Sequence, residues 1–303
     1  MSADAPARLY ILAFDHRGSF EKGIFGIEGK PTDEQCALIS DAKRAIFEGF
    51  QSALAEGAPS DAAGILVDEE FGADIARAAK AKDVILAMPV EKSGEDEFQF
   101  QYGDDFGSHI EAFDPRFTKV LVRYNPEGDR ELNQRQAATL RILSDWLHQH
   151  RRSFLFELLV PATVEELEDA GSADRFDHGQ RPDLVIRAIS ELQQAGVEPD
   201  IWKIEGIDTR EDCGRVATQA RSSGRDNVRC IVLGRGADEK RVEEWLRVAA
   251  GADGFVGFAI GRTIWWDALK AMRAGDITRQ EAAARIGASY RRAIDVYREA
   301  AGA

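Results

Sequence analysis

Short apolar runs alternate along the chain with longer stretches in which apolar residues recur at helical spacing. The short runs predict β-strands at residues 9–15, 63–68, 84–90, 119–124, 154–160, 201–205, 230–233 and 254–260. The amphipathic stretches predict helices at residues 33–57, 71–81, 105–113, 131–150, 181–195, 209–222, 238–250, 264–274 and 278–300. The starts of three of these helices resemble a capping box, with the pairs Thr32 and Gln35, Thr209 and Asp212, and Thr278 and Glu281.

This alternation predicts an α/β fold, a parallel (β/α)8 TIM barrel with one extra C-terminal helix, as a single domain over residues 1–303. Each predicted strand is nearly continuous in apolar residues, as expected for a sheet that is covered on both faces. An open doubly wound sheet is the competing fold, but the glycine-rich pattern that usually follows its first strand is missing. The two longest connections, residues 91–107 and 163–182, follow strands and are candidate lids or substrate loops.

The composition limits the partners that the protein can bind. The 303 residues include 53 Asp and Glu against 39 Lys and Arg, a net charge of −14, which opposes binding to nucleic acid or to an anionic membrane. No segment has the roughly 20 apolar residues of a membrane span, and the first residues contain no apolar run, so we expect a cytoplasmic protein. Cys36, Cys213 and Cys230 lie far apart, which indicates neither a disulfide framework nor a cysteine metal site. A small anionic substrate fits this charge if cations gather in one pocket.

Lys203 is the first candidate for chemistry, because it lies in an otherwise apolar predicted strand and shares one face of it with Glu205. A buried lysine is unfavourable unless it is paired or functional. Burial and a second cation can lower a lysine pKa by about 3 units, which frees the amine to attack a carbonyl. Lys203 is therefore a candidate for a Schiff base, and a lysine that is merely paired with a carboxylate is the alternative.

Other predicted strands also carry isolated charges. Asp15 ends the first strand, Glu157 lies within the fifth, and Lys119 and Arg123 share one face of the fourth. Because Lys119, Glu157 and Lys203 belong to consecutive strands, their side chains can meet inside the barrel as a nucleophile, a neighbouring cation and a proton carrier. A salt-bridged layer inside the barrel, without catalysis, is the alternative.

Glycine and arginine recur at the ends of the last two predicted strands. Gly234, Arg235 and Gly236 follow the seventh strand, and Gly261 and Arg262 follow the eighth. Barrels often bind phosphate at these two loops, where backbone N–H groups and a helix N-terminus face the anion, and arginine adds a bidentate contact. The repeated pattern predicts a phosphate site.

These segments resemble the class I aldolases of the tagatose 1,6-bisphosphate type. The resemblance rests on Ala13–Ser19, Val90–Gly94, Lys119–Tyr124, Glu157, Trp202–Glu205, Gly234–Gly236 and Gly261–Arg262. The runs at 14–20, 119–129 and 201–206 more closely resemble the 5-dehydro-2-deoxyphosphogluconate aldolase-like module that is fused to sugar kinases in myo-inositol catabolism. The resemblance to the tagatose-type aldolases covers nearly the whole predicted barrel.

The resemblance implies that Lys203 is the Schiff-base lysine, that Lys119 and Glu157 are its partners, and that Asp15 handles the substrate hydroxyl. The implied substrate is 5-dehydro-2-deoxy-6-phosphogluconate, which is cleaved to dihydroxyacetone phosphate and malonate semialdehyde without a metal or other cofactor. His16 departs from the tagatose-type pattern, which tends to have glutamine there.

The far end of such a substrate carries a carboxylate. Lys92, Arg123 and Arg17 are candidates to bind this carboxylate, with a rim salt bridge as the alternative for each. Glu205 is counted with the substrate-binding residues.

Several alternatives remain at this stage. The substrate can be another ketose phosphate, such as tagatose 1,6-bisphosphate or a sulfosugar phosphate. A metal-dependent aldolase and a non-catalytic phosphosugar-binding barrel are two further hypotheses, although the histidines are scattered at positions 16, 109, 148, 150 and 178. Trp265 and Trp266 either pack beneath the phosphate loop or lie in a subunit interface, so a homo-oligomer is compatible with the sequence.

Overall fold

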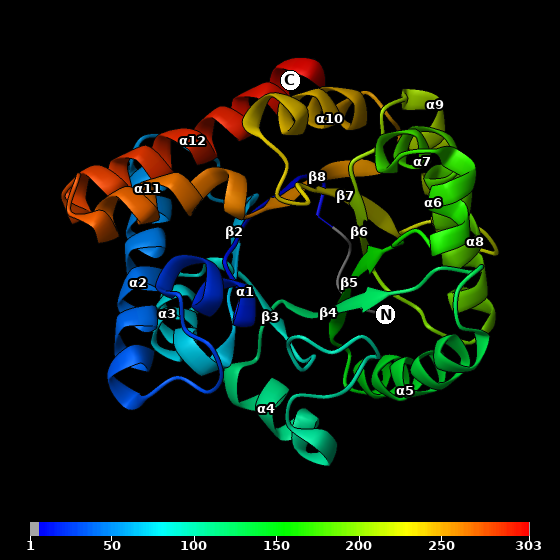
Figure 1. Ribbon diagram of the computed structural model, residues 1–303, viewed down its shortest axis with the longest axis horizontal. Coiled ribbons are helices and arrows are strands. Elements are labelled where there is room, and N and C mark those ends of the chain that lie inside the picture. Colours follow the sequence, from blue (N-terminus) through cyan, green and yellow to red (C-terminus); the bar gives the residue numbers. More distant parts are fainter. Residues whose placement is uncertain (1–5, 303) are drawn as a thin grey trace.

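The protein, seen here in a computed structural model that describes residues 6–302, is a closed barrel of parallel strands surrounded by helices (Figure 1). Its strands are β1 (Leu9–Ala13), β2 (Ala63–Leu66), β3 (Ile85–Pro89), β4 (Phe117–Arg123), β5 (Ser153–Leu159), β6 (Ile201–Glu205), β7 (Arg229–Leu233) and β8 (Phe255–Ile260). Each strand pairs with the next along the chain, and β8 closes the barrel on β1 with Leu9 opposite Gly257. The predicted (β/α)8 barrel is confirmed.

The helices around the barrel agree with the apolar periodicity. They are α2 (Asp33–Ala55), α3 (Glu69–Ala81), α4 (Phe106–Phe113), α5 (Arg130–Gln149), α8 (Arg181–Gln194), α9 (Arg210–Ala220), α10 (Glu239–Ala250), α11 (Arg262–Ala274) and α12 (Arg279–Ala300). The last helix, α12, is the extra C-terminal one and packs against α2, α10 and α11. None of the helices within residues 6–302 is long and apolar enough to cross a membrane.

Helix capping follows the sequence at two of the three predicted starts. Thr32 and Thr278 form complete capping boxes at the starts of α2 and α12. At α9 the Thr209 side chain accepts the backbone N–H of Asp212, but the Asp212 carboxylate accepts the Thr209 hydroxyl rather than its backbone N–H. The capping-box prediction is therefore wrong in that half of the motif.

The two long connections contain elements that the periodicity did not predict. Residues 163–182 form two short helices, α6 (Val164–Ala170) and α7 (Ala173–Gly179), before α8 begins. The 91–107 connection starts as a small hairpin with a bridge between Glu91 and Phe100, followed by the single turn η2 (Gly103–Asp105). After β1 the chain forms α1 (Gly18–Phe20) and a π-helical turn, η1 (Glu21–Phe25). These elements are too short for an apolar period to be read from sequence.

The strands separate two apolar cores. The larger core lies between the barrel and the helices, and the smaller one fills the barrel interior. Phe117, Leu155 and Ile201 contribute to the inner core from β4, β5 and β6. Because side chains alternate across a strand, the next inward positions on these strands are 119, 157 and 203. The barrel is thus filled with apolar side chains below a charged layer at the carboxyl ends of the strands.

Candidate active site

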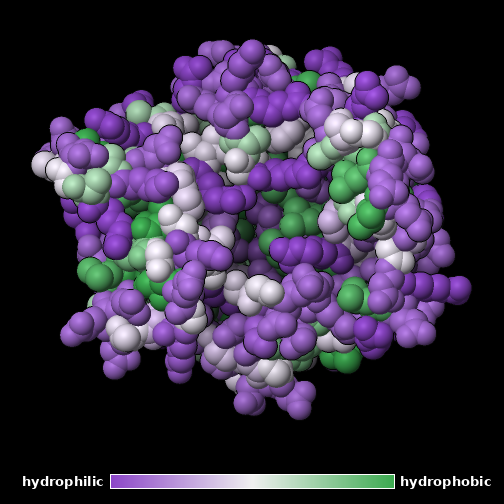
Figure 2. Space-filling model, in the orientation of Figure 1, coloured by the Kyte–Doolittle hydropathy of each residue, from purple (hydrophilic) through white to green (hydrophobic). Residues whose placement is uncertain are grey.

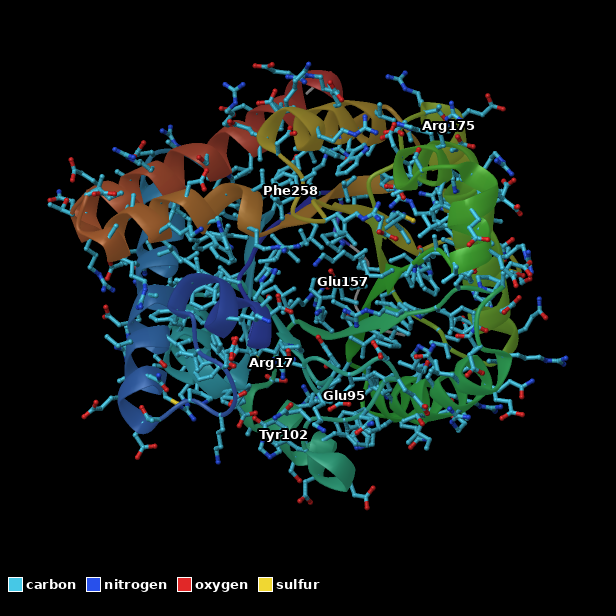
Figure 3. The ribbon with its side chains drawn as sticks, viewed as in Figure 1. Arg17, Glu95, Tyr102, Glu157, Arg175 and Phe258 are labelled. Atoms are coloured by element: carbon cyan, nitrogen blue, oxygen red, sulfur yellow. The ribbon has the colours of Figure 1, made fainter. Side chains whose placement is uncertain are left out.

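A cavity of about 450 Å³ opens at the carboxyl ends of the strands. Figure 2 shows it as a hollow near the middle of this face, bordered mainly by hydrophilic side chains. Its lining includes Asp15, Lys119, Glu157 and Lys203, and Figure 3 places Glu157 near the centre of the barrel mouth. The size is suitable for a small ligand, and the position is the one where barrel enzymes keep their sites.

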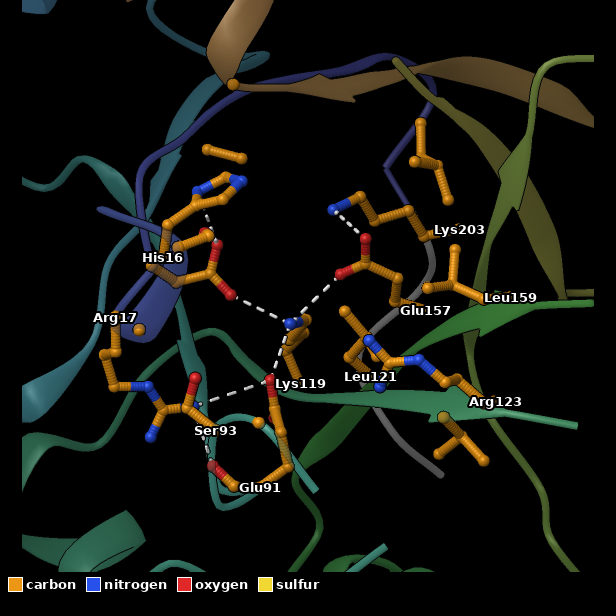
Figure 4. A pocket seen from close by; sticks show the side chains of 18 of the residues that line it. His16, Arg17, Glu91, Ser93, Lys119, Leu121, Arg123, Glu157, Leu159 and Lys203 are labelled. Carbon is orange, nitrogen blue, oxygen red and sulfur yellow. Dashed lines mark hydrogen bonds and ion pairs between the residues drawn. The ribbon is translucent and has the colours of Figure 1, made fainter. Parts of the chain in front are cut away.

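Lys203 lies at the inner wall of this cavity. Its residue is only 4% exposed, and its Nζ lies 2.8 Å from Oε1 of Glu157 (Figure 4). Glu157 is directly opposite Lys203 in the parallel register of β5 and β6, which explains why the two side chains meet. The neighbours Trp202 and Ile204 point to the other face and belong to the outer core. The sequence placed Lys203 on the inward face correctly.

Lys119 is surrounded by carboxylates. Its Nζ lies 2.8 Å from Asp15 Oδ2, 2.7 Å from Glu91 Oε1 and 3.0 Å from Glu157 Oε2 (Figure 4). Burial lowers the pKa of the Lys119 ammonium, but the carboxylates around it raise that pKa well above its usual range. Lys119 is therefore a fixed cation, whereas Lys203 pairs with one carboxylate among residues 6–302, that of Glu157.

The carboxyl groups around Lys119 differ in their proton affinity. Burial raises the pKa of Asp15, but the charge of Lys119 outweighs burial and holds that pKa below its usual range. Burial also raises the pKa of Glu157, and the charges of Lys119 and Lys203 lower it on balance. For Glu91, burial dominates and raises the pKa despite the charges of Lys119 and Arg17. Glu157 therefore rests ionised, and Glu91 is the carboxyl that takes up a proton more readily.

Glu91 was not among the residues singled out from the sequence. One of its oxygens, Oε2, is buried and has no hydrogen-bond partner. Its signal was present, because Glu91 directly follows the apolar residues of the third predicted strand, as Asp15 follows the apolar residues of the first. It was missed because it lies one residue beyond the predicted strand, in the 91–107 connection, which the sequence marked as a candidate lid or substrate loop without indicating a functional carboxylate.

The predicted phosphate residues gather at one side of the cavity. Gly234, Arg235, Gly236, Gly261 and Arg262 all line it. Helix α11 begins at Arg262 without a side-chain cap. The N–H of Ile264 donates to the carbonyl of Gly261 at 2.8 Å, so the N–H groups of Arg262 and Thr263 are the ones that can face a ligand or water. A Cβ at Gly261 would overlap the carbonyl oxygen of Ala13, so this position requires glycine.

Glu205 and the Arg235 side chain have partners within the protein. Glu205 accepts the backbone N–H of Val160 at 2.9 Å and pairs with Arg181 at 3.1 Å and Arg235 at 3.1 Å. Arg235 also pairs with Asp177. Glu205 is buried and is not among the residues that line the cavity. Our prediction that Glu205 contacts substrate is therefore not supported by its placement.

The three predicted carboxylate-binding cations all line the cavity. Arg17 is buried and donates to the carbonyl of Glu91 at 2.7 Å, and its Nε has no partner. Lys92 is half exposed and pairs with Glu95 at 2.6 Å, while Arg123 donates to the Glu95 carbonyl at 3.2 Å. Figure 3 shows Arg17 and Glu95 on the same side of the barrel mouth. These three cations therefore lie beside the 91–107 connection, whose Glu91, Glu95, Asp96 and Glu97 also line the cavity.

His16 also lines the cavity, next to Asp15. Its ring lies edge-on to Trp265 with centroids 5.4 Å apart, and its backbone carbonyl accepts Nζ of Lys43 at 2.9 Å. Nδ1 is buried without a hydrogen-bond partner and lies 3.9 Å from Oδ1 of Asp15, although a quarter of the side-chain surface is exposed. Burial lowers the pKa of His16 to about 4, against the opposing charge of Asp15. The imidazole is therefore uncharged at neutral pH and can donate or accept a hydrogen bond to or from a ligand.

Trp265 packs against the His16 ring. It is fully buried, and its Nε1 donates to the carbonyl of Ala13 at 2.9 Å. Of the two placements left open for the tryptophans, Trp265 takes the one beneath the loops. Trp266 is half-buried beside Gly23, where a Cβ would overlap its ring.

Replacing His16 with glutamine should reduce the loss of unfolding free energy as the pH falls below about 6.5. Between about pH 4 and pH 6.5 the unfolded chain binds a proton at His16 and the folded chain does not, so this residue makes the wild type less stable as pH falls. Urea unfolding near pH 4.5 and pH 7 should show a smaller loss of unfolding free energy in His16→Gln than in the wild type. His148→Gln, an exposed change on α5, is the control. An identical pH dependence in His16→Gln and the wild type would contradict the neutral imidazole.

Solved structures share this fold. A fructose-bisphosphate aldolase from Plasmodium falciparum, solved with TRAP and a small-molecule inhibitor, is 14% identical with a TM-score of 0.67 and covers 97% of this chain and 91% of its own. A Corynebacterium glutamicum protein is 15% identical with a TM-score of 0.62, over 97% and 86%. A fructose-bisphosphate aldolase from Slackia heliotrinireducens is 15% identical with a TM-score of 0.56, over 93% and 86%. At these identities the likeness establishes the barrel fold.

Sequence comparison identifies the family. No curated protein sequence matches the chain at a significant level. A family model with the description "Uncharacterized protein conserved in bacteria (DUF2090)" matches residues 2–301, nearly the whole chain. The protein therefore belongs to the DUF2090 family of bacterial proteins.

Proposed function

We propose that this protein is a class I aldolase in which Lys203 forms a Schiff base with the ketone of a phosphorylated keto-sugar or keto-sugar acid. The observation that carries the proposal is the placement of Lys203 at the wall of the cavity, where it pairs with one carboxylate oxygen of Glu157 while Lys119 pairs with the other. The aldolases among the solved structures of the same fold support the reaction class.

Substrate binding precedes the chemistry. A phosphate at Gly234–Gly236 and the start of α11 would place the ketone beside Lys203, so that attack becomes effectively unimolecular. Glu157, 2.8 Å from Nζ, accepts the proton of the Lys203 ammonium and leaves a neutral amine. Lys119 stays charged throughout and keeps the three carboxylates close together.

The covalent steps then follow. The Lys203 amine adds to the ketone carbon. Glu157 gives its proton to the carbinolamine oxygen, which leaves as water, and the resulting iminium withdraws electrons. A carboxylate, Glu157 or Asp15, takes the proton of the hydroxyl on the second carbon from the iminium carbon. The bond between that hydroxyl-bearing carbon and the carbon next to the iminium then breaks and releases an aldehyde. The enamine that remains is protonated on carbon and hydrolysed, which restores the amine and releases the ketone product.

The substrate that we propose is 5-dehydro-2-deoxy-6-phosphogluconate. Cleavage between its third and fourth carbons gives malonate semialdehyde and dihydroxyacetone phosphate. The sequence resemblance supports this choice, and so do Arg17, Lys92 and Arg123 in the cavity lining, which are candidates to bind a carboxylate at the end opposite the phosphate.

Borohydride trapping and a substrate panel test the proposal. Dihydroxyacetone phosphate with borohydride should add mass to the peptide that contains Lys203. The panel contains 5-dehydro-2-deoxy-6-phosphogluconate, tagatose 1,6-bisphosphate and a sulfosugar phosphate, with triose phosphate release coupled to NADH oxidation. A borohydride adduct at Lys203 together with cleavage of only another member of the panel would overturn the proposed substrate but not the proposed chemistry. Chelator-sensitive cleavage without trapping would indicate a metal enzyme, and binding without either would indicate a non-catalytic phosphosugar-binding barrel.

A further inference from the structure

Four side chains next to the cavity form a closed ring of ion pairs, which we call the ion quartet: Asp177, Arg181, Glu205 and Arg235. Nη1 of Arg181 lies 3.3 Å from Asp177 Oδ1 and 3.1 Å from Glu205 Oε1. Nε of Arg235 lies 3.1 Å from the same Glu205 oxygen, and its Nη1 contacts Asp177 Oδ2. Each arginine thus contacts both carboxylates, and the charges of the quartet cancel.

The quartet joins segments that are far apart in the chain. Asp177 comes from α7, Arg181 from the start of α8, and Glu205 from the end of β6, two residues after Lys203. Arg235 lies in the predicted phosphate turn, residues 234–236. Arg181 and Glu205 are buried, and Asp177 exposes only 20% of its side chain. The quartet therefore anchors the phosphate turn to the strand of Lys203 and to the long β5–α8 connection.

The backbone of the phosphate turn needs such an anchor. Arg235 has φ 51° and Gly236 has φ 73°, so two consecutive residues are left-handed. Glycine adopts this conformation freely, but a non-glycine residue keeps it only when its surroundings hold it. At Arg235 the surroundings are the two carboxylates that bind its guanidinium. The N–H of Ala237 closes the turn on the carbonyl of Gly234 at 2.9 Å.

The phosphate turn also positions Arg262, the second arginine of the predicted phosphate site. The carbonyl of Arg235 accepts Nη2 of Arg262 at 3.3 Å. A Cβ at Gly236 would overlap the guanidinium of Arg262, so the two are tightly packed. Thr263 continues the link, because its hydroxyl donates to the carbonyl of Ala237 at 2.8 Å. The orientation of Arg262 at the start of α11 therefore depends on the conformation of residues 234–236.

We propose that Asp177 is a positioning residue for phosphate binding, acting through Arg235 and without touching the anion itself. Two effects of removing Asp177 oppose each other. The lost negative charge alone would strengthen anion binding, whereas release of the turn would misplace the backbone N–H groups and Arg262. The turn dominates, because the Arg235 guanidinium is already bound by carboxylates and contributes to the site through its backbone. The identity of the anion as the substrate's phosphate rests on the proposed function.

Titration calorimetry with inorganic phosphate tests this proposal without catalysis. Asp177→Ala should raise the Kd for phosphate about fivefold or more, the loss expected for one charge-assisted contact. Asp177→Asn, which keeps an acceptor oxygen for Arg235, should lie between Asp177→Ala and the wild type. The matched control is Asp174→Ala on the same helix, because the Asp174 side chain is 82% exposed and pairs with His178. Its Kd should equal that of the wild type.

Turnover assays separate positioning from general damage. In the active enzyme, Asp177→Ala should raise KM for the phosphorylated substrate with kcat unchanged, and thermal unfolding should show a folded protein. If Asp177→Ala does not fold, Asp177→Asn decides. An unchanged or lower Kd for phosphate, a fall in kcat alone, or a wild type that binds no phosphate would overturn the inference. If phosphate binds as expected but borohydride traps nothing at Lys203, the aldolase proposal fails and the inference stands.

Discussion

Lys203→Ala should abolish turnover, with kcat lower by at least roughly 10⁴-fold, as expected for loss of a covalent nucleophile. No other residue of the proposed mechanism can replace the amine, because Lys119 is held as an ammonium by three carboxylates. The borohydride adduct with dihydroxyacetone phosphate should disappear in the same variant. Triose phosphate release and intact-mass spectrometry measure the two effects.

The fold should survive this substitution, since Glu157 keeps its contact with Lys119 when Lys203 is removed. Circular dichroism and thermal unfolding check that expectation. Lys270→Ala is the control, because it removes an exposed lysine from α11, where Nζ lies over the ring of Trp266. It should keep both turnover and the adduct. Turnover retained by Lys203→Ala would exclude Lys203 as the nucleophile.

Lys119→Met should lower the unfolding free energy by about 3–5 kcal/mol at neutral pH, the usual loss when a buried ion-pair partner is removed. Asp15, Glu91 and Glu157 would then face one another without the cation that lies between them. Turnover should fall by at least about 100-fold, because the carboxyl groups no longer stay ionised and cannot accept protons as the mechanism requires. Denaturant unfolding and the triose phosphate assay measure the two changes.

The loss of stability should depend on pH. In the wild type the pKa values of Asp15 and Glu157 are lowered, mainly by Lys119 against the effect of burial. Their contribution to stability is therefore present above the ordinary carboxyl pKa of about 4 and is lost as pH falls. Without Lys119, burial dominates and raises both pKa values, so the variant should lose stability as pH rises. The difference between the two proteins should be largest above pH 7 and smallest near pH 4.5.

A surface lysine provides the control for this measurement. Lys80→Met removes an exposed lysine that pairs with Asp114 at 2.5 Å, and surface pairs contribute at most about 1 kcal/mol. Its effect should be small, without the large change between pH 4.5 and pH 7 that we expect for Lys119→Met. If Lys119→Met is as stable as the wild type above pH 7, the carboxylates do not depend on Lys119.

The sequence was sufficient to predict those features that depend on the spacing of apolar residues along one helix or strand. Apolar runs of strand length and amphipathic stretches of helix length predicted the strands and the nine long helices within a few residues. Side-chain alternation then determined the inward face of each strand. Lys119, Glu157 and Lys203 lie on that face of consecutive strands. The register puts Glu157 directly opposite Lys203. On β4, Leu121 is opposite Glu157, and Lys119 lies two residues before Leu121 on the same face. Their meeting could therefore be predicted from spacing.

Glu205 shows where this reasoning ends. It shares the inward face with Lys203 but lies at the last position of β6, where Arg181 from α8 and Arg235 from the phosphate turn reach it. The face of a strand can be read from alternation, but a side chain at the strand's end contacts whichever loop or helix lies beside it. Those neighbours are determined by tertiary packing.

The candidate chemistry of the protein, a lysine pair and a carboxylate inside a barrel with glycine-rich turns at two strand ends, was thus determined by the sequence alone. Only the tertiary structure decided which lysine is the fixed cation, because Asp15 lies 104 residues from Lys119 along the chain and Glu91 comes from a connection without a period. It also decided that Arg235 binds Asp177 rather than being free for an anion. Local spacing encodes which face a side chain takes, whereas long-range ion pairs depend on how loops and helices pack around the barrel.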